Sequence, residues 1–379
     1  MSQKKEFVLK SFGSKNFRVL CKEYGISTKT GYKWRKRFMD HGWGGLEEWS
    51  RRPLSHAKEL SEAVVCEMVR LKTKHKFWGA RKVRDVYART HEEVPSESSF
   101  KRVLDRAGLV EHRRMARRSE AGRICTGRRA NAPNEIWTVD FKGWWYKANG
   151  ERCEPLTVRD ECSRYVLEVR VVPDARTATV RACFERLFEQ NGLPGAIRSD
   201  NGVPFASSTG VLGLSKLSAW WVVLGIDLER SRPGCPQDNG GHERLHLDIE
   251  RELRGEEQQA SFDEWRRTFN QERPHEALAM KRPAELYQPS ALKFVGTPED
   301  VRYPKMEPRR VKSTGHIHYG KHSIFISSAL AGWSVGLEAC EQGKFNVHFG
   351  RLLLGQYDES RGSFERTEDG SNRSQKEGT

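Results

Sequence analysis

The sequence predicts a multidomain protein with an all-α N-terminal part, an α/β core containing a mixed sheet, and a small C-terminal β-barrel. Three observations lead to this prediction. The excess positive charge lies in the first third of the chain, where apolar residues repeat at helical spacing. In the middle, short apolar runs alternate with helical patterns, and short strand-like runs separated by glycines follow. With 379 residues, the chain has room for two to four domains.

The net charge of +15 is distributed unevenly. Residues 1–130 hold 32 Lys and Arg against 15 Asp and Glu, whereas the remaining residues hold 34 against 36. A basic N-terminal third joined to a nearly neutral remainder is typical of a polyanion-binding module attached to a separate functional domain. A merely solubilising surface charge is the alternative interpretation.

The composition excludes membrane and disulfide-stabilised classes. Mean hydropathy is −0.75, and no apolar run approaches the roughly 18 residues that a membrane span needs. No signal-peptide core follows the first residues. The eight cysteines are scattered without a CxxC pair, which favours reduced thiols in the cytoplasm and argues against a zinc ribbon.

Residues 1–52 are predicted to form a helix-turn-helix domain. Residues 16–24 have a helical pattern, Gly25 suits the position that ends a helix, and Ser27 or Thr28 can cap the next one. The aromatic residues that face the core of this unit are Trp34 and Phe38. The basic side chains left to contact DNA in the major groove are Lys29, Lys33, Lys36 and Arg37. A structural three-helix unit with a solvated basic face is the alternative.

Residues 53–111 predict a second helix-turn-helix domain. Helical spacing runs over 63–74 and 80–89, and a third helix begins at Ser96 and ends at Gly108. Residues 112–133 lack periodicity and predict a basic linker along the phosphate backbone, with a plain disordered tether as the alternative. The further candidates for DNA contact in the connector, this domain and the linker are Arg51, Arg52, Arg81, Lys82, Arg113 and Arg114.

Residues 134–290 predict the α/β core. Its expected strands are 135–141, 156–158, 165–172, 196–199 and 227–229, and its expected helices are 174–190, 214–224 and 242–253. Three consecutive strands followed by alternating helices and strands is the order of a ribonuclease-H-like core. Residues 291–361 predict a small β-barrel from short strands with glycine turns, and 362–379 predict a polar, disordered tail.

Three carboxylates stand where this pattern of elements brings distant segments together. Asp140 ends one buried strand, Asp200 ends another before an Asn-Gly turn, and Glu243 opens a helix after a Pro/Gly loop. Two strand ends and a helix start supply the ligands that a two-magnesium phosphoryl-transfer site requires. Asp140 is expected mid-sheet, bridging both ions, with Asp200 on one ion and Glu243 on the other.

Other polar and aromatic residues near these carboxylates have simpler interpretations. We expect no metal ligand among Asp160, Asp238 and Asp248, because the chain has 51 acidic residues and most lie on the surface. His242 and His246 lack partner ligands at zinc spacing, so they are expected to contact phosphate or to be structural. The paired tryptophans at 144–145 and 220–221 are expected to pack in cores.

With these motifs in view, the chain resembles the bacterial insertion-sequence transposases that have a retroviral-integrase-type D,D,E catalytic core. The resemblance covers nearly the whole length. The segments that carry it are 25–34, 49–53, 78–82, 137–140, 199–202, 232–234, 236–237, 239–244, 274–278 and 282–283. Taken jointly, these motifs are highly specific, although a helix-turn-helix or the Ser-Asp-Asn-Gly of 199–202 would be much less so alone.

The resemblance implies an RNase-H-like fold, catalytic and metal-binding roles for Asp140, Asp200 and Glu243, and dependence on two Mg²⁺ or Mn²⁺ ions. It implies that a metal-activated water cuts the ends of the element. The resulting 3′-hydroxyls then attack target DNA by direct transesterification. The expected partners are terminal inverted repeats, target DNA and further copies of the chain in a dimer or larger assembly, at the bacterial nucleoid.

Two features depart from the family. The spacing from Asp200 to Glu243 is longer than the 35 residues common among relatives, and a Gly/Ser-rich loop at 206–213 accounts for the excess. No His/Cys zinc knuckle precedes the core, so the helix-turn-helix domains must select the DNA. Two other functions stay open: a DNA-binding regulator with an inactive integrase-like core, and a plain ribonuclease-H-type nuclease.

Overall fold

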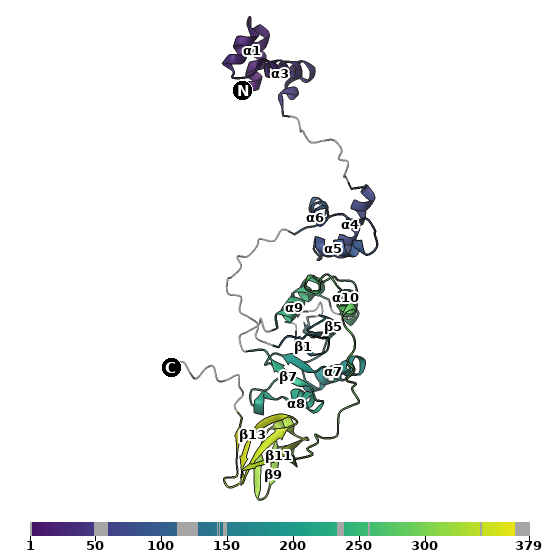
Figure 1. The fold of residues 1–379 in the computed structure, drawn as a ribbon, viewed down its shortest axis with the longest axis vertical. Coiled ribbons are helices and arrows are strands. Elements are labelled where there is room, and N and C mark those ends of the chain that lie inside the picture. The colour runs from purple at the N-terminus through teal and green to yellow at the C-terminus, as the bar shows by residue number, and fades with distance from the viewer. Residues whose placement is uncertain are drawn as a thin grey trace, which may run out of the picture. The chain divides into compact units, whose positions relative to one another are not determined.

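The computed structural model describes residues 2–48, 60–111, 128–141, 143, 145–146, 150–232, 239–256, 258–341 and 343–367. The chain divides into two compact units, Met1–Val64 and Val65–Thr379. In Figure 1 the second unit contains a helical block, an α/β core and a β-rich C-terminal part.

The first unit contains α1 (Gln3–Gly13), α2 (Phe17–Glu23), α3 (Thr28–His41) and the 3₁₀ turn η1 (Gly42–Leu46). The predicted turn between α2 and α3 is confirmed. Gly25 has a φ of +63°, and the hydroxyl of Ser27 caps α3 by accepting the backbone N–H of Thr30 at 3.1 Å. Helix α1 was not predicted, yet it supplies the centre of the hydrophobic core.

That core is built from aromatic rings around Phe7, which is fully buried. The ring of Phe7 makes edge-on contacts with Phe17, Tyr24 and Trp34. Gly31 of α3 lies so close to these rings that a Cβ there would be 2.9 Å from Phe7. As predicted, Trp34 and Phe38 pack on the core side of α3, which leaves the basic residues of that helix on its outer face.

A helical block forms α4 (Glu62–Lys74), α5 (Ala80–Ala88) and α6 (Glu97–Arg106). The Ser96 hydroxyl caps α6 as predicted, because it accepts the backbone N–H of Ser99 at 3.2 Å. The apolar residues buried within the block are Met68, Leu71, Val83, Tyr87, Phe100 and Leu104. The order and spacing of these helices agree with the second helical domain expected from the sequence.

The core contains a five-stranded mixed sheet in the order β5-β4-β1-β6-β7. Its strands are β1 (Ile136–Phe141), β4 (Pro155–Asp160), β5 (Val166–Val171), β6 (Ala196–Ser199) and β7 (Asp227–Arg230). β4 pairs antiparallel with β1 and β5, whereas β6 pairs parallel with β1 and β7. A short hairpin of β2 (Trp145–Tyr146) and β3 (Arg152–Cys153) lies outside this sheet. β1 is therefore the central strand, as expected for the strand that bears Asp140.

Helices cover both faces of the sheet (Figure 1). α7 (Thr177–Asn191) and α8 (Lys216–Val223) pack on one face through a cluster that includes Trp137, Val139, Trp220 and Trp221. The two tryptophans of α8 are buried, which confirms the packing role predicted for them. α9 (Gly240–Leu253) and α10 (Gln259–Gln271) lie on the side of the other face and bury a second cluster with β5. α10 was not predicted.

The C-terminal part forms two antiparallel sheets rather than one closed sheet. The larger sheet has the order β14-β13-β12-β11-β8, and the smaller one pairs β9 with β10. The strands are β8 (Glu307–Arg310), β9 (His316–Tyr319), β10 (His322–Phe325), β11 (Ser334–Glu341), β12 (Lys344–Phe349), β13 (Leu352–Asp358) and β14 (Ser363–Arg366). β14 corrects the expected start of the disordered tail at residue 362, since backbone pairing with β13 orders these polar residues.

The loop 206–213 and the chain just beyond residue 290 both pack against neighbouring parts of the second unit. The loop 206–213 contains the turn η2 (Val211–Gly213), and Val211 is buried in a cluster with residues of the β-rich part. The extra loop between Asp200 and Glu243 therefore supports the C-terminal sheets. Phe294 packs on the core cluster, so the chain just beyond residue 290 still lies against the α/β core.

Within the described part of the chain, no helix is long and apolar enough to cross a membrane. The cysteines for which the structure gives a state are free thiols: Cys21, Cys66, Cys153, Cys162, Cys183 and Cys340.

Candidate active site

One face of the sheet is polar where β1, β4 and β6 meet. Side chains alternate along β1, so Trp137 and Val139 enter the hydrophobic core while Thr138 and Asp140 share the opposite face. Thr157 of β4 stands directly across from Asp140, and its hydroxyl donates to the Asp140 backbone carbonyl at 2.9 Å. Asp140 lies half-buried at the end of the central strand, beside the hydroxyl of Thr157.

Asp200 follows the neighbouring parallel strand at the matching level. Thr138 of β1 is in register with Arg198 of β6, and two residues further along each strand come Asp140 and Asp200. Because the carboxyl ends of parallel strands meet at one edge of a sheet, both aspartates leave the sheet at the same edge. The Asp200 carboxylate accepts the backbone N–H of Gly202 at 3.1 Å. A Cβ on Gly202 would stand 2.9 Å from that carboxylate, so glycine leaves it room.

Helix α9 is attached to this polar face by a fully buried histidine. The two ring nitrogens of His242 hydrogen-bond with the hydroxyls of Thr138 at 2.8 Å and Thr157 at 2.7 Å. Burial, and then the neighbouring His246 and Arg159, hold the pKa of His242 well below its ordinary value. The ring is therefore neutral, with one nitrogen donating and the other accepting, and it joins α9 to both β1 and β4.

Glu243 follows this anchor in the first turn of α9, and its side chain is exposed. Because His242 holds the start of α9 on the polar face, the backbone of Glu243 has a fixed position near the sheet edge that bears the two aspartates. His246, one turn further, hydrogen-bonds with Thr157 at 2.9 Å, and its other ring nitrogen lies 3.9 Å from the Asp140 carboxylate. Both histidines have structural partners, which agrees with one of the two roles expected for them.

Asp140 and Asp200 leave the sheet at one edge, but the three carboxylates do not form a closed set of ligands. Among the described residues, which include Asp140, Asp200 and Glu243, no three His, Cys, Asp or Glu side chains are grouped closely enough to hold a metal ion. Three carboxylates repel one another, which opposes close approach. The donor chemistry nevertheless fits Mg²⁺, a hard cation that prefers oxygen ligands and needs few of them from the protein.

Three family models match parts of the chain. Two models described as integrase core domains match residues 130–236 and 224–283. The chain carries an integrase core. A model described as a homeodomain-like domain matches residues 30–104, which include α3 and most of the second helical block. The RNase-H-like order of the sheet and the N-terminal helical region thus both agree with the families matched.

The chain is also similar to proteins of bacterial insertion elements. The chain is 26% identical over 235 residues to the uncharacterized 31.7 kDa protein of insertion element IS407 from Burkholderia multivorans, covering 59% of this chain and 80% of that protein. It is 27% identical over 248 residues to the uncharacterized 39.2 kDa protein of insertion element IS476 from Xanthomonas euvesicatoria, covering 62% and 68%. These matches confirm the resemblance to bacterial insertion-sequence transposases with an integrase core.

Solved structures show a limited likeness. The HTLV-2 integrase catalytic core domain, determined in complex with magnesium, has a TM-score of 0.34 and 18% identity, covering 42% of this chain and all of that one. A simian T-cell lymphotropic virus intasome in complex with PP2A regulatory subunit B56 gamma has a TM-score of 0.37 and 16% identity, covering 68% and 90%. The assignment of the integrase core depends on the family models and the strand order.

The basic residues predicted on α3 lie mostly on one exposed stripe. Lys29, Lys33 and Lys36 are exposed, and their spacing of four and three residues places them on one side of the helix. Arg37 is half-buried and has an interaction partner. The stripe can reach phosphates without any rearrangement of the aromatic core.

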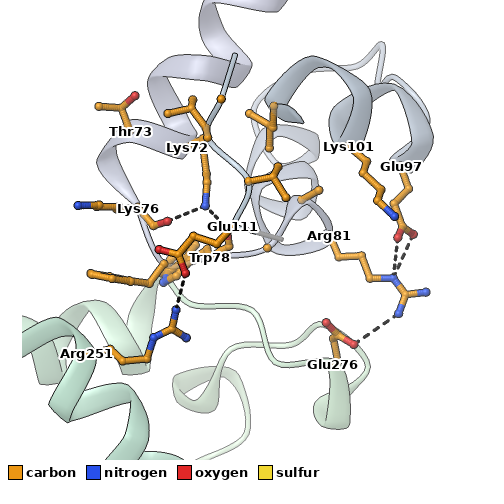
Figure 2. A pocket seen from close by; sticks show the side chains of 17 residues that line it. Lys72, Thr73, Lys76, Trp78, Arg81, Glu97, Lys101, Glu111, Arg251 and Glu276 are labelled. Atoms are coloured by element: carbon orange, nitrogen blue, oxygen red, sulfur yellow. Dashed lines mark hydrogen bonds and ion pairs between the residues drawn. The ribbon is translucent and has the colours of Figure 1, made fainter. Parts of the chain in front are cut away.

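The basic residues predicted on α5 have different surroundings. Arg81 is exposed and forms ion pairs with Glu97 at 3.0 Å and Glu276 at 3.4 Å (Figure 2). Lys82 is half-buried, and burial, together with nearby Arg273, lowers its pKa to about 8. The other candidates fall outside the described residues: Arg51, Arg52, Arg113 and Arg114.

The structure describes two of the three acids that were not expected to bind metal. Asp160 is buried and fixes the turn between β4 and β5 by accepting the N–H and hydroxyl of Ser163. Asp248 of α9 is buried and pairs with Arg273 at 2.9 Å. Both are structural, whereas Asp238 falls outside the described residues.

The residue that sequence reasoning missed in this region is Arg273. Its side chain is 3% exposed and joins Asp248 to Glu252, whose carboxylate lies 3.3 Å away. We expect Arg273→Met to lower the free energy of unfolding by about 3–5 kcal/mol, because Glu252 loses its cation and buried Asp248 keeps only the longer pair with Arg244 at 3.5 Å. Chemical denaturation of the full chain measures this change. Arg267→Met, which removes an exposed pair with Glu264, should cost less than about 1 kcal/mol, and equal losses would contradict the prediction.

Proposed function

We propose that the chain is a DNA transposase of an insertion sequence. It binds the terminal inverted repeats, cuts the ends of the element with water, and joins the resulting 3′-hydroxyls to target DNA. The observation that carries this proposal is the placement of Asp140 and Asp200 at the ends of adjacent parallel strands, with the start of α9 anchored beside them. The insertion-element relatives support it.

Asp140, Asp200 and Glu243 would hold two Mg²⁺ or Mn²⁺ ions. When bound, the ions would activate water and offset charge that develops on the phosphate. The chain's own part is to place the carboxylates, to keep His242 neutral as the anchor of α9, and to orient Asp140 beside His246. In joining, the 3′-oxygen forms a new P–O bond while a bond of the target backbone breaks and leaves a 3′-hydroxyl. The exchange needs no energy-rich cofactor.

The assay that tests this function uses full-length protein with duplexes carrying both ends of the element that encodes it. With Mg²⁺ we expect cut ends and joined products, and with EDTA neither. Cutting without joining would favour a plain nuclease. Binding without cutting would favour a regulator with an inactive core. One observation favours that second candidate, since the three carboxylates are not grouped as a ready metal site.

Selection of the ends falls to the N-terminal helices, because chemistry at phosphates carries no sequence information. Lys33→Ala together with Lys36→Ala should weaken binding of the full chain to a duplex. The slope of log affinity against log salt should fall by about 2, since two phosphate contacts are lost. Fluorescence anisotropy over a range of KCl measures the slope. Lys10→Ala on α1, which is already paired with Glu6 at 2.9 Å, should change the slope little, and a flat salt dependence of the wild type would count against the assignment.

The domain roles follow from this proposal. Domains 1–52 and 53–111 bind DNA, 112–133 links them to the core at 134–290, and a homo-oligomer pairs the two ends. We also propose that residues 291–361, extended by β14, act as a small barrel. β8 lies beside β9, and β10 lies beside β14, so the two sheets surround one hydrophobic cluster even though hydrogen-bonded pairing does not close the ring.

A further inference from the structure

Two pockets lie on either side of the turn that contains Glu276, within the second unit. In the larger one three of the lining cations have partners (Figure 2). The ammonium of Lys72 donates to the carbonyls of Lys76 and Trp78, Arg81 pairs with Glu276, and Arg251 reaches Glu111.

The smaller pocket has a volume of about 210 Å³ and is lined by four cations and two carboxylates. Its lining cations come from α5, β4, the β4–β5 turn and α9: Lys82, Arg159, Arg164 and Arg244. Asp248 pairs with Arg273 at 2.9 Å and with the lining Arg244 at 3.5 Å, and Glu276 pairs with Arg81 at 3.4 Å. Within the part of the chain that the structure describes, the side chains of Lys82 and Arg164 make no hydrogen bond and no salt bridge.

Buried polar atoms on the wall also lack partners. His275 lines the pocket and is 8% exposed, and its Nε2 has no hydrogen-bond partner among the described residues. Burial, then the charges of Lys82 and Arg273, lower the pKa of His275 to about 2, so the ring is neutral and can donate one N–H. The Nε of buried Arg159 is unpartnered within the same part of the chain, while its Nη2 binds Glu161 at 2.7 Å. A buried donor without an acceptor is unfavourable, and an anion in the pocket would supply the missing acceptor.

The pocket adjoins the candidate active site. Arg159 stands opposite Thr138 on the polar face of the sheet, and Gly241 and Arg244 flank Glu243 along α9. A Cβ at Gly241 would overlap the Arg159 guanidinium, so glycine here leaves room for that cation. An anion bound in the pocket would therefore sit on the same face as the carboxylates, beside the helix that carries Glu243.

We infer that this pocket binds one phosphate group of the DNA backbone and so positions the duplex next to Asp140 and Glu243. A phosphodiester matches the wall because its oxygens accept hydrogen bonds from lysine, guanidinium and imidazole donors. The volume admits a phosphate group but no base pair. The identity of the anion as DNA rests on the proposed function, whereas the need for an anion rests on the pocket alone.

The test measures binding of full-length protein to a 30-base-pair duplex of mixed sequence, by anisotropy between 0.05 and 0.3 M KCl. The variants are Lys82→Met and Arg164→Gln, with Lys101→Met as the control from the larger pocket. Each pocket variant should lower the salt slope by about 1 and weaken binding about eightfold at 0.1 M salt, because one counterion-releasing contact is lost. The double variant should lose little more than either single one, since both side chains hold the same phosphate.

Unchanged slopes in both pocket variants, or an equal change in Lys101→Met, would overturn the inference. Potassium phosphate at matched ionic strength separates the two sources of the anion. Competition with DNA in the wild type, lost in the variants, supports the DNA assignment. If phosphate binds the wild type while the variants bind DNA normally, the pocket holds a free anion and the DNA assignment fails. Joining activity of the wild type is scored separately, so the pocket and the transposase function can fail independently.

Discussion

Replacing Asp200 by Asn should reduce cutting and joining of DNA by about 10³-fold or more. The amide keeps the size of the side chain and can still accept the N–H of Gly202, but it removes one negative charge from the group that would hold the ions. Because ion binding is expected to supply several kcal/mol of transition-state stabilisation, the chemical step should suffer while DNA affinity stays within about twofold. Joined products on gels and anisotropy on the same preparation measure both quantities.

The matched control is Asp227→Asn on β7, two strands from β1 in the same sheet. Asp227 is partly exposed and pairs with Arg351 at 3.2 Å, far from any proposed role in catalysis. The joining rate of Asp227→Asn should stay within about threefold of the wild-type rate, because surface changes of this kind alter stability by about 0.5 kcal/mol or less. A normal joining rate in Asp200→Asn would remove the carboxylate assignment and leave the regulator as the better interpretation.

Local signals in the sequence were sufficient for much of the fold. Ser27 and Ser96 were expected at helix starts and cap α3 and α6, because a cap depends on atoms only three residues apart. The strand at 196–199 was also predicted from apolar runs and turn residues, and the helix expected over 174–190 is α7, which begins at Thr177. Such features need no knowledge of tertiary contacts.

Elements that depend on distant partners were missed or shortened. β8 and β14 are polar strands that exist because β11 and β13 offer backbone partners, so no alternating apolar pattern marks them. β4 extends to Asp160, beyond the apolar stretch predicted, because the carboxylate and Ser163 close its turn. Tertiary pairing decided these elements.

The same distinction between local and tertiary signals applies to the candidate site. The positions of Asp140, Asp200 and Glu243 at strand ends and a helix start could be read from the sequence, since each is a local boundary. The environment of the basic residues could not. Arg81 meets an acid 195 residues away, and Lys82 lines a pocket together with β4, the β4–β5 turn, α9, α10 and the turn that contains Glu276. Charge patterns therefore identified a basic surface but not which cations were already neutralised.

His242→Ala is the second substitution with a large expected effect. It removes a fully buried ring and leaves the hydroxyls of Thr138 and Thr157 without the partner that bridges them. The cavity and the lost hydrogen bonds should lower the free energy of unfolding by about 2–4 kcal/mol. Because the ring fixes the start of α9, Glu243 should also shift, and a displacement of about 1 Å can cost about 100-fold in rate.

Thermal unfolding and joining assays on the full chain separate the two consequences of this change. Leu247→Ala on the same helix is the control, since that side chain is 52% exposed and should alter neither measurement by much. His242→Gln, which keeps a donor and an acceptor, should recover part of the stability but less of the rate, because its longer chain cannot reproduce the position of both ring nitrogens. A His242→Ala protein that unfolds and joins DNA like the wild type would show that α9 is held by its apolar contacts alone. His242 would then fill space in the core without setting the position of Glu243.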